Sequence, residues 1–341
     1  MNLRKVALLS MRHLRIHRAA AATGHALGVI FSAHRVQPAR TTPFQPNATL
    51  TITPEFLEAA ILKVRAMGYE IIGLDETYER LLDTGGSRKN RRPFACITFD
   101  DGYRDNRTWA FPVLAKHGVP HTIYVPVAFA DGNGVLWWEL LERIVAGNDL
   151  VELEGTGKFN TATHAEKTRA FSELAQHLNA MSPVTAHAWA VRAASHYGIN
   201  GDAVCRELMM GWDELAEFNR QELLTIGGHT ANHFRLAKLS SEEAAKEIER
   251  GMAGLEARLG LRPAHLSYPF GDPGSAGARE FEIAASLGLK TAVTTNGGIL
   301  RTTNSKQLMS LPRLSLNRVC NDVRCLEVLA SGAPWSLIPR W

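Results

Sequence analysis

Residues 95–106 read Ala-Cys-Ile-Thr-Phe-Asp-Asp-Gly-Tyr-Arg-Asp-Asn, a short apolar run that leads directly into two adjacent carboxylates. The run Ala95–Phe99 is rich in β-branched and aromatic residues and is bounded by Pro93 and Gly102. This composition predicts a buried β-strand that ends where the carboxylates begin. We therefore expect polar chemistry at the carboxyl end of this strand.

Asp100 and Asp101 are the two carboxylates at this strand end. Successive strand residues point to opposite faces, so the pair shares one face only if the chain turns there, and Gly102 permits that turn. Two such carboxylates are costly to bury unless a divalent cation neutralises one of them and leaves the other as a base. The alternative interpretation is a solvated Asp-Asp-Gly turn without a metal.

A second polar cluster, Gly-Gly-His-Thr-Ala-Asn-His at residues 227–233, also follows a predicted strand. His229 and His233 are four residues apart, which places both imidazoles on one face if the turn is helical. Imidazole is a common metal ligand, and two histidines with one carboxylate leave coordination positions open for water and substrate. The alternative is two unrelated surface histidines, since the chain contains 13 histidines.

Predicted strands and helices alternate along most of the chain, and the polar clusters follow strand ends. This pattern indicates a parallel α/β barrel, with a doubly wound sheet as the alternative. We place the barrel at residues 26–341, with a mainly helical insertion at about 137–215 that includes the adjacent pair Trp137-Trp138. We expect strands at 26–33, 69–74, 95–99, 121–127, 223–227, 265–269, 291–295 and 311–316, and helices at 53–67, 76–82, 108–117, 240–259 and 280–287.

The composition is that of an ordinary globular protein, with 45% hydrophobic and 21% charged residues in a chain of 341. Residues 1–40 contain seven arginines and lysines and no acidic residue, whereas the remainder has 38 − 7 = 31 basic against 34 acidic residues. The basic charge therefore belongs to the N-terminal region and does not form a nucleic-acid-binding surface on the domain.

Residues 1–25 are interpreted as a basic N-terminal extension with an irregular surface conformation. The alternative is a basic amphipathic helix in weak contact with a membrane surface or a partner. We find no convincing signal peptide and no apolar run long enough to span a membrane, so we expect a cytoplasmic protein. Cys320 and Cys325 are expected to be free thiols in a reducing compartment, and the alternative is that they pair with each other.

Both polar clusters together resemble the polysaccharide deacetylases of carbohydrate esterase family 4, the nodulation-type chitooligosaccharide deacetylases. The first two signature motifs of that family match residues 98–102 and 229–233. Three weaker matches, at residues 34–36, 268–272 and 311–313, extend the resemblance over roughly residues 29–316. The resemblance implies a distorted (β/α)7-type barrel.

The resemblance also implies roles for individual residues. Asp101, His229 and His233 would hold a divalent metal, most often Zn²⁺, although the ligand set also suits Co²⁺ or Ni²⁺. Asp100 would be the general base, and a backbone amide near Tyr103 would stabilise the oxyanion. The segment Tyr268, Pro269 and Phe270 would form a wall of the substrate groove.

Two positions depart from the commonest pattern of that family. Ser267 stands where the third motif has an arginine, and Arg313 is our candidate to take the place of that arginine beside Asp100. The alternative is that Arg313 anchors a C-terminal loop. The last histidine of the chain is His265, so the catalytic histidine of the final motif is missing. His34 is our candidate for the general acid, because it ends the first predicted strand and would face the same rim of a barrel. The alternative is a structural histidine that bonds to the backbone at the strand end.

The function expected from these observations is hydrolysis of the N-acetyl group of N-acetylglucosamine units in an oligo- or polysaccharide. Two alternatives remain open at this stage. One is a non-catalytic relative that keeps the metal site and binds carbohydrate. The other is a hydrolase of a small non-peptide amide.

Overall fold

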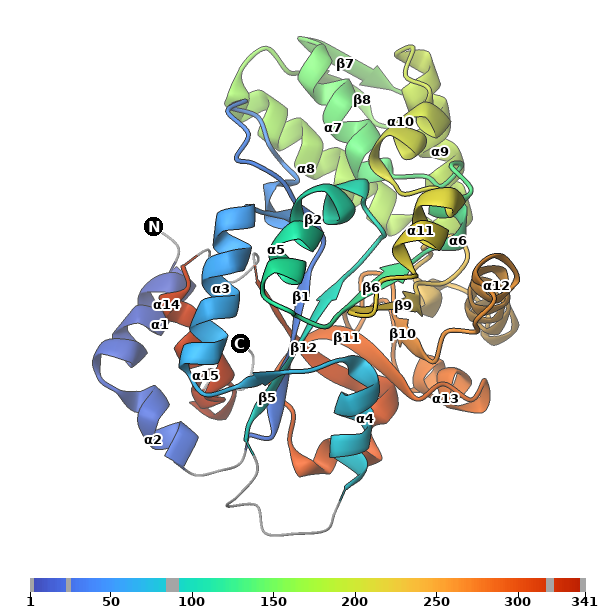
Figure 1. Ribbon diagram of the computed structural model, residues 1–341. Coiled ribbons are helices and arrows are strands. Elements are labelled where there is room, and N and C mark those ends of the chain that lie inside the picture. Colours follow the sequence, from blue (N-terminus) through green and yellow to red (C-terminus); the bar gives the residue numbers. More distant parts are fainter. Residues whose placement is uncertain (1–2, 23–25, 84–91, 317–321, 338–341) are drawn as a thin grey trace.

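The computed structural model describes residues 3–22, 26–83, 92–316 and 322–337. Within these residues, seven parallel strands form a closed barrel, in agreement with the barrel prediction, and the doubly wound alternative is wrong (Figure 1). A short eighth strand, β4 (Glu70–Ile71), adds to β5 outside the ring. Around the ring, the strands follow the order β1 (Gly28–Ala33), β12 (Leu311–Ser315), β11 (Thr291–Gly297), β10 (His265–Ser267), β9 (Leu224–Gly228), β6 (His121–Val125) and β5 (Phe94–Phe99).

Helices cover the outside of the barrel and begin where the sequence provides capping residues. Thr53 caps α3 by accepting a hydrogen bond from the backbone N–H of Phe56. Ser240 and Glu243 form a capping box at the start of α12. The outer helices are α3 (Pro54–Ala66), α4 (Leu74–Leu82), α5 (Phe111–Lys116), α12 (Ser241–Leu259) and α13 (Ala278–Ser286).

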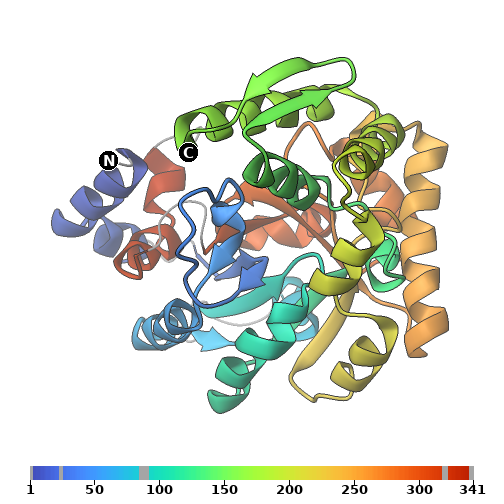
Figure 2. The same ribbon diagram turned by 90° about the horizontal axis from the view of Figure 1, so that it is seen from above.

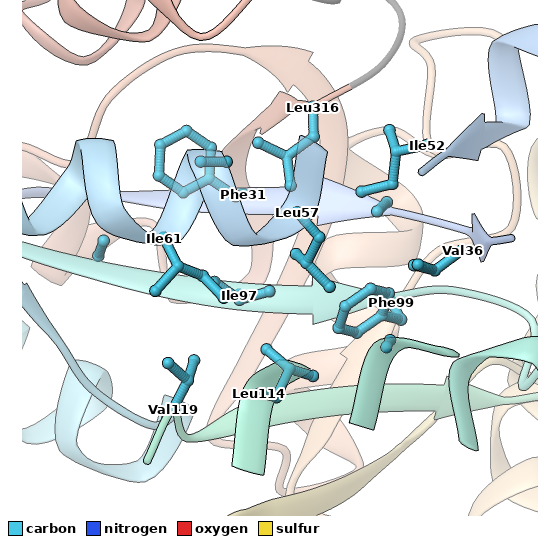
Figure 3. Close-up of a cluster of buried hydrophobic side chains, with 14 of the residues drawn as sticks. Phe31, Val36, Ile52, Leu57, Ile61, Ile97, Phe99, Leu114, Val119 and Leu316 are labelled. Atoms are coloured by element: carbon cyan, nitrogen blue, oxygen red, sulfur yellow. The ribbon is translucent and has the colours of Figure 1, made fainter. Parts of the chain in front are cut away.

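Strand residues alternate between the core outside the barrel and the core inside it. On β5, Ile97 and Phe99 point outward and pack against Leu57 of α3 and Leu114 of α5 (Figure 3). Cys96, on the same strand, belongs to the separate inner cluster. The alternation therefore directs the residue that follows Phe99 toward the barrel interior.

The insertion covers one side of the carboxyl end of the barrel (Figure 1). Its buried side chains, among them Leu141, Leu174 and Trp189, form a hydrophobic cluster separate from that of the barrel. An antiparallel hairpin interrupts the helices, a feature that the helical periodicity does not predict. The elements are α7 (Trp137–Gly147), β7 (Leu150–Leu153), β8 (Gly157–Asn160), α8 (His164–Ala180), α9 (Pro183–His196), α10 (Gly201–Leu208) and α11 (Trp212–Phe218), preceded by the short α6 (Val127–Ala130).

Two further short strands lie beside the mouth of the barrel. Strands β2 (Arg35–Val36) and β3 (Thr51–Ile52) pair in parallel, and the loop between them includes residues 37–50. Short 3₁₀ helices occur at Ala48–Leu50, Leu236–Lys238, Thr302–Lys306 and Leu308–Ser310, and Asn106–Ala110 forms a π-helical turn before α5.

The N-terminal region is helical, so the expectation of an irregular conformation is wrong. Helices α1 (Leu3–His13) and α2 (Ile16–Ala22) pack near α14 (Arg324–Ala330) and α15 (Ala333–Leu337). Leu8 is fully buried, and Arg12 forms a 2.7 Å ion pair with Glu327. None of the helices in the described residues is long and apolar enough to cross a membrane.

The cysteines differ from the expectation of free thiols in one case. Cys325 is disulfide-bonded, so the prediction of a free thiol at this position is wrong. Cys320 lies outside the described residues. Cys96 and Cys205 are free and buried.

Candidate active site and metal centre

The two carboxylates after β5 both face the mouth of the barrel. Asp100 continues the inward alternation of β5, whereas Asp101 reaches the same side through a left-handed backbone with φ 76°. Gly102 follows with φ 73°, so the turn predicted for the glycine begins one residue earlier. A left-handed aspartate is strained by roughly 1–3 kcal/mol, and such strain is typical of functional sites.

His229 and His233 follow β9 and approach each other, with ring centroids 4.9 Å apart. The turn that joins them is not helical, so the helical condition under which the sequence spacing would place both rings on one face is not met. Thr230 and His233 instead have positive φ values of 65° and 59°. The backbone N–H of His233 donates to Thr230 Oγ1 over 3.2 Å and stabilises this strained turn.

Asp101, His229 and His233 form a buried group whose candidate ligand atoms lie within 4.8 Å of one another. Oδ1 of Asp101 lies 3.4 Å from His229 Nε2 and 3.2 Å from His233 Nε2, and has no hydrogen-bond partner. Burial by itself raises the pKa of Asp101, but both histidines hold it well below its usual range. A buried carboxylate oxygen between two imidazole nitrogens fits a divalent cation.

The tautomer of His229 also fits a metal ligand. Its Nδ1 lies 2.6 Å from the backbone oxygen of Ser267, which can only accept a hydrogen bond. Nδ1 therefore carries the proton, and the Nε2 lone pair faces Asp101. The sequence pattern marks Ser267 only as the position of a missing arginine and does not predict this contact.

Side chains far away in the sequence hold the 229–233 turn. Glu247 of α12 accepts hydrogen bonds from the backbone N–H of Asn232 over 3.0 Å and from its side chain over 2.7 Å. Gly251, one helical turn further, lies so close to Thr230 that a Cβ there would be 2.6 Å from the Thr230 carbonyl carbon. Neither residue was predicted, because helix α12 shows only an ordinary amphipathic pattern in the sequence.

Three aromatic rings surround His233. The centroid distances are 5.4 Å to Phe129, 5.4 Å to Trp138 and 4.9 Å to Phe270. Trp138 comes from the insertion and donates a 2.9 Å hydrogen bond from Nε1 to the hydroxyl of Tyr103. The insertion therefore contributes directly to the surroundings of the candidate metal ligands.

Asp100 is held by Arg313 of β12 through two hydrogen bonds. Nη1 donates to Oδ1 and Nη2 to Oδ2, both over 2.8 Å. Arg313 also donates to Ser267 Oγ over 3.0 Å and to the backbone oxygen of Thr294 over 2.9 Å. Burial alone raises the pKa of Asp100, but the charge and hydrogen bonds of Arg313 outweigh it and lower the pKa.

His34 lies at the end of β1 with Nε2 3.8 Å from Oδ2 of Asp100. Asn106 donates a 2.8 Å hydrogen bond to the backbone oxygen of His34. The neighbouring Arg35 forms ion pairs with Asp105 at 2.8 Å and with Glu139 of α7 at 3.0 Å. Asp105, which no sequence motif marks as part of the site, thus helps to hold the segment that carries His34.

A cleft of about 560 Å³ opens above these residues. It is lined by His34, Asn47, Thr49, Leu50, Asp100, Asp101, Trp137, Trp138, Phe171, Asn179, His229, His233, Arg235, Phe270, Asp272, Thr295 and Ser315. All the predicted metal ligands, together with Asp100 and His34, line this one cleft. Arg313 does not line the cleft itself and lies behind Asp100.

Of the predicted substrate-binding residues, only Phe270 lines the cleft. Tyr268 is a core residue whose hydroxyl donates to the backbone oxygen of Met309 over 3.0 Å. Pro269 is buried, and the Tyr103 ring is buried beneath Trp138 and Arg35. The prediction that Tyr268 and Pro269 form a wall of the groove is therefore wrong, because packing removes their side chains from the cleft surface. The role expected near Tyr103 is that of a backbone amide, and it stays a prediction.

The sequence model of a family described as polysaccharide deacetylase matches residues 87–292, which is more than half of the chain. The chain belongs to the polysaccharide deacetylase family. No curated protein matches the chain.

Several solved structures share the fold of this chain. The Streptococcus pyogenes deacetylase PplD in complex with acetate is 19% identical, with a TM-score of 0.56 over 85% of this chain and 92% of that chain. IcaB from Ammonifex degensii is 17% identical, with a TM-score of 0.56 over 89% and 98%. BC0361, a polysaccharide deacetylase from Bacillus cereus, is 15% identical, with a TM-score of 0.52 over 89% and 68%.

Proposed function

We propose that this chain is a metal-dependent deacetylase that hydrolyses the N-acetyl group of N-acetylglucosamine units in an oligo- or polysaccharide. The observation that carries the proposal is the convergence of two arrangements in one cleft. One is the Asp101, His229 and His233 triad, and the other is Asp100 held ionised by Arg313. Family membership supports the hydrolase class.

The triad would hold the cation through Oδ1 of Asp101 and Nε2 of both histidines. When bound, a divalent cation supplies polarisation of the acetamide carbonyl and a lower pKa for water. Zn²⁺ suits two imidazoles and one carboxylate best, and Co²⁺ or Ni²⁺ are the alternatives.

Asp100 is the proposed general base. Its lowered pKa keeps the carboxylate ionised at neutral pH, so it can accept a proton from the attacking water. The bidentate contact with Arg313 fixes the orientation of both oxygens.

His34 is the proposed general acid. Amide hydrolysis releases an amine, which must be protonated as the C–N bond breaks. The imidazole lines the cleft beside Asp100 and is the histidine there that does not belong to the triad, among the described lining residues. From the end of β1, His34 would take the role of the catalytic histidine that the final motif lacks here.

Aromatic and polar side chains line the rest of the cleft, as a sugar requires. Trp137, Phe171 and Phe270 offer apolar faces, whereas Asn47 and Asp272 offer hydrogen-bonding groups. Sugar rings have both apolar faces and hydroxyl edges, so this mixture supports a saccharide substrate.

The test is acetate release from N-acetylglucosamine oligomers by the purified protein before chelation, after chelation and after addition of zinc or cobalt. We expect release that is lost on chelation, restored by the metal and absent in Asp100→Asn. Asp149→Asn changes an exposed aspartate of the insertion and is the matched control. Activity that survives both chelation and Asp100→Asn would contradict the proposal.

A further inference from the structure

The imidazole of His34 has few polar contacts of its own. Its Nε2 lies 3.8 Å from Oδ2 of Asp100, which is beyond hydrogen-bond distance. Its Nδ1 is buried and has no hydrogen-bond partner among the described residues. A general acid must be held within reach of the group that it protonates. The direction of this imidazole therefore depends mainly on how the backbone of His34 is held.

The backbone around His34 is fixed by two side chains of the segment that follows β5. Asn106 donates a 2.8 Å hydrogen bond to the backbone oxygen of His34. Oδ1 of Asp105 accepts hydrogen bonds from the backbone N–H of Val36 over 3.0 Å and from the Asn106 side chain over 3.1 Å. These contacts join the segment that carries His34 to the segment that follows the paired carboxylates.

Arg35 extends this arrangement to the insertion. Its Nε donates to Oδ2 of Asp105 over 2.8 Å and its Nη1 to Oε1 of Glu139 over 3.0 Å. Its guanidinium also lies 4.8 Å from the ring centroid of Tyr103. The three charged side chains leave only 7–11% of their surface exposed, so water and salt screen these ion pairs little. Arg35 is thus held between a carboxylate of the barrel and a carboxylate of the insertion.

Glu139 lies in the first turn of α7, beside a residue that contacts the candidate metal site. The preceding residue, Trp138, packs on His233 with ring centroids 5.4 Å apart. Two successive residues of one helical turn therefore contact a candidate metal ligand and, through Arg35, the segment that carries His34. Seen from above, the insertion lies along one side of the barrel mouth, with α7 next to the β2–β3 segment (Figure 2).

We infer that Glu139 is a positioning residue for the general acid: it fixes, through Arg35, the backbone from which the His34 imidazole reaches the cleft. This inference rests on the proposed deacetylase function and adds a residue of the insertion to the groups that the reaction requires. Without Glu139, Arg35 pairs with Asp105 alone and the segment gains freedom to shift. A displacement of about 1 Å can lower the rate by up to about 10²-fold when reacting groups must be aligned.

Glu142, three residues further along α7, provides a matched control. It is as buried as Glu139, with 5% against 6% of its surface exposed. It also joins the insertion to the barrel, since it accepts a 2.9 Å hydrogen bond from Asn47 and pairs with Arg40 at 2.9 Å. Its partners do not include Arg35. A general role in attaching the insertion would therefore give Glu139 and Glu142 variants the same properties, whereas a role in positioning His34 would separate them.

The first test compares acetate release from N-acetylglucosamine oligomers with hydrolysis of a nitrophenyl acetate ester, whose leaving group needs no protonation. For Glu139→Ala we expect kcat on the amide to fall by about 10–100-fold with KM within about twofold of the parent value, and the ester rate to stay near that of the parent. Glu139→Gln keeps an oxygen that accepts from Arg35 and should recover most of the loss. Glu142→Gln should leave the ratio of amide to ester rates unchanged. An equal loss on both substrates in Glu139→Ala, or the same selective loss in Glu142→Gln, would overturn the inference.

The second test asks whether Glu139 acts through His34. In a His34→Gln background, Glu139→Ala should cause no further loss of kcat on the amide, because its effect requires the imidazole. A further loss as large as that in the parent background would show that Glu139 acts independently of His34. That result would overturn the inference and leave the proposed function intact.

A third test does not depend on turnover. In the zinc-loaded protein with ¹⁵N-labelled histidine, the ring signals of His34 are assigned by their loss in His34→Gln. Glu139→Ala should shift or broaden these signals, and Glu142→Gln should leave them in place. Unchanged His34 signals in Glu139→Ala would overturn the inference. This readout remains valid if no acetate is released from any substrate, a result that would contradict the proposed function alone.

Discussion

Arg313 Nη1 and Nη2 each lie 2.8 Å from one carboxylate oxygen of Asp100, and both residues are buried, with 1% and 2% of their surface exposed. The two residues are far apart in the sequence, on β12 and β5, and meet inside the barrel. Two parallel charge-assisted hydrogen bonds fix the carboxylate more firmly than one. The pair explains how a buried carboxylate remains ionised.

Replacing Arg313 by Met should leave Asp100 buried without a charge partner. We expect a loss of about 3–5 kcal/mol in the free energy of unfolding and a large loss of turnover, because breaking one side of a buried pair exposes the full desolvation penalty of the other. Urea unfolding and acetate release measure these effects. If Arg313→Met unfolds at the same urea concentration as the parent, the buried pair contributes little.

An exchange of positions tests whether Arg313 acts through Asp100. Arg313 donates to Ser267 Oγ over 3.0 Å, so position 267 borders the same carboxylate. Ser267→Arg in an Arg313→Ser background should recover part of the activity that Arg313→Ser alone loses. No recovery in a correctly folded double variant would indicate that only position 313 provides the required geometry.

Removal of the metal should destabilise the protein. A ligand at 100–1,000 times its dissociation constant stabilises the folded state by about 3–4 kcal/mol, so chelation should lower the thermal unfolding midpoint and zinc should restore it. Asp101→Asn should show no response to zinc, whereas the exposed-site variant Asp149→Asn should respond like the parent. Metal analysis should find one ion per chain in the parent protein.

Gly251→Ala should weaken metal binding although it replaces none of the candidate metal ligands. The added Cβ would lie 2.6 Å from the carbonyl carbon of Thr230 and would displace the turn that carries His229 and His233. Zinc affinity, measured by competition with a chelator, should fall by about tenfold or more, as for other residues that position metal ligands. Gly147→Ala is the control, because a Cβ there meets no atom within 4 Å.

His34→Gln should lower kcat on N-acetyl substrates by about 10²–10⁴ if His34 protonates the leaving amine. The metal content should not change. A nitrophenyl acetate ester releases a leaving group that needs no protonation, so the variant should hydrolyse it at nearly the parent rate. An equal loss on amide and ester would assign His34 a different role.

His121 should make stability depend on pH below neutrality. It is buried among Phe99, Phe111 and Phe218, and burial lowers its pKa from 6.5 to about 4. Between these pH values the unfolded state binds the proton more strongly, so the free energy of unfolding should fall by about 3 kcal/mol as the pH decreases from 6.5 to 4. The free energy of unfolding of His121→Phe, measured by urea unfolding across this pH range, should depend less steeply on pH than that of the parent protein.

Local sequence patterns predicted the barrel and the two strand ends that carry the candidate metal ligands, whereas the choice of Asp101 over Asp100 as a ligand came from the family resemblance. The apolar run before Asp100 and Asp101, and the similar run before His229, mark strand ends, and in a parallel barrel all such ends meet at one rim. The residue types then indicate the chemistry, since two imidazoles and a carboxylate suit few tasks other than metal binding.

Tertiary structure alone decided which side chains surround the candidate metal ligands. The sequence pattern could not distinguish Phe270, which lines the cleft, from Tyr268, which packs into the core two residues earlier. Glu247 and Gly251 look like ordinary residues of an amphipathic helix, yet the packing of α12 places them against the 229–233 turn.

The lining of the cleft has the same origin. Trp137, Asn179 and Arg235 are distant in the sequence and carry no shared motif, and only the packing of the insertion on the barrel brings them together. Strand ends and ligand types depend on residues that are close together in the sequence, so the periodicity of the sequence predicts them. The shape of the cleft depends on contacts between residues far apart in the sequence, which no local pattern encodes.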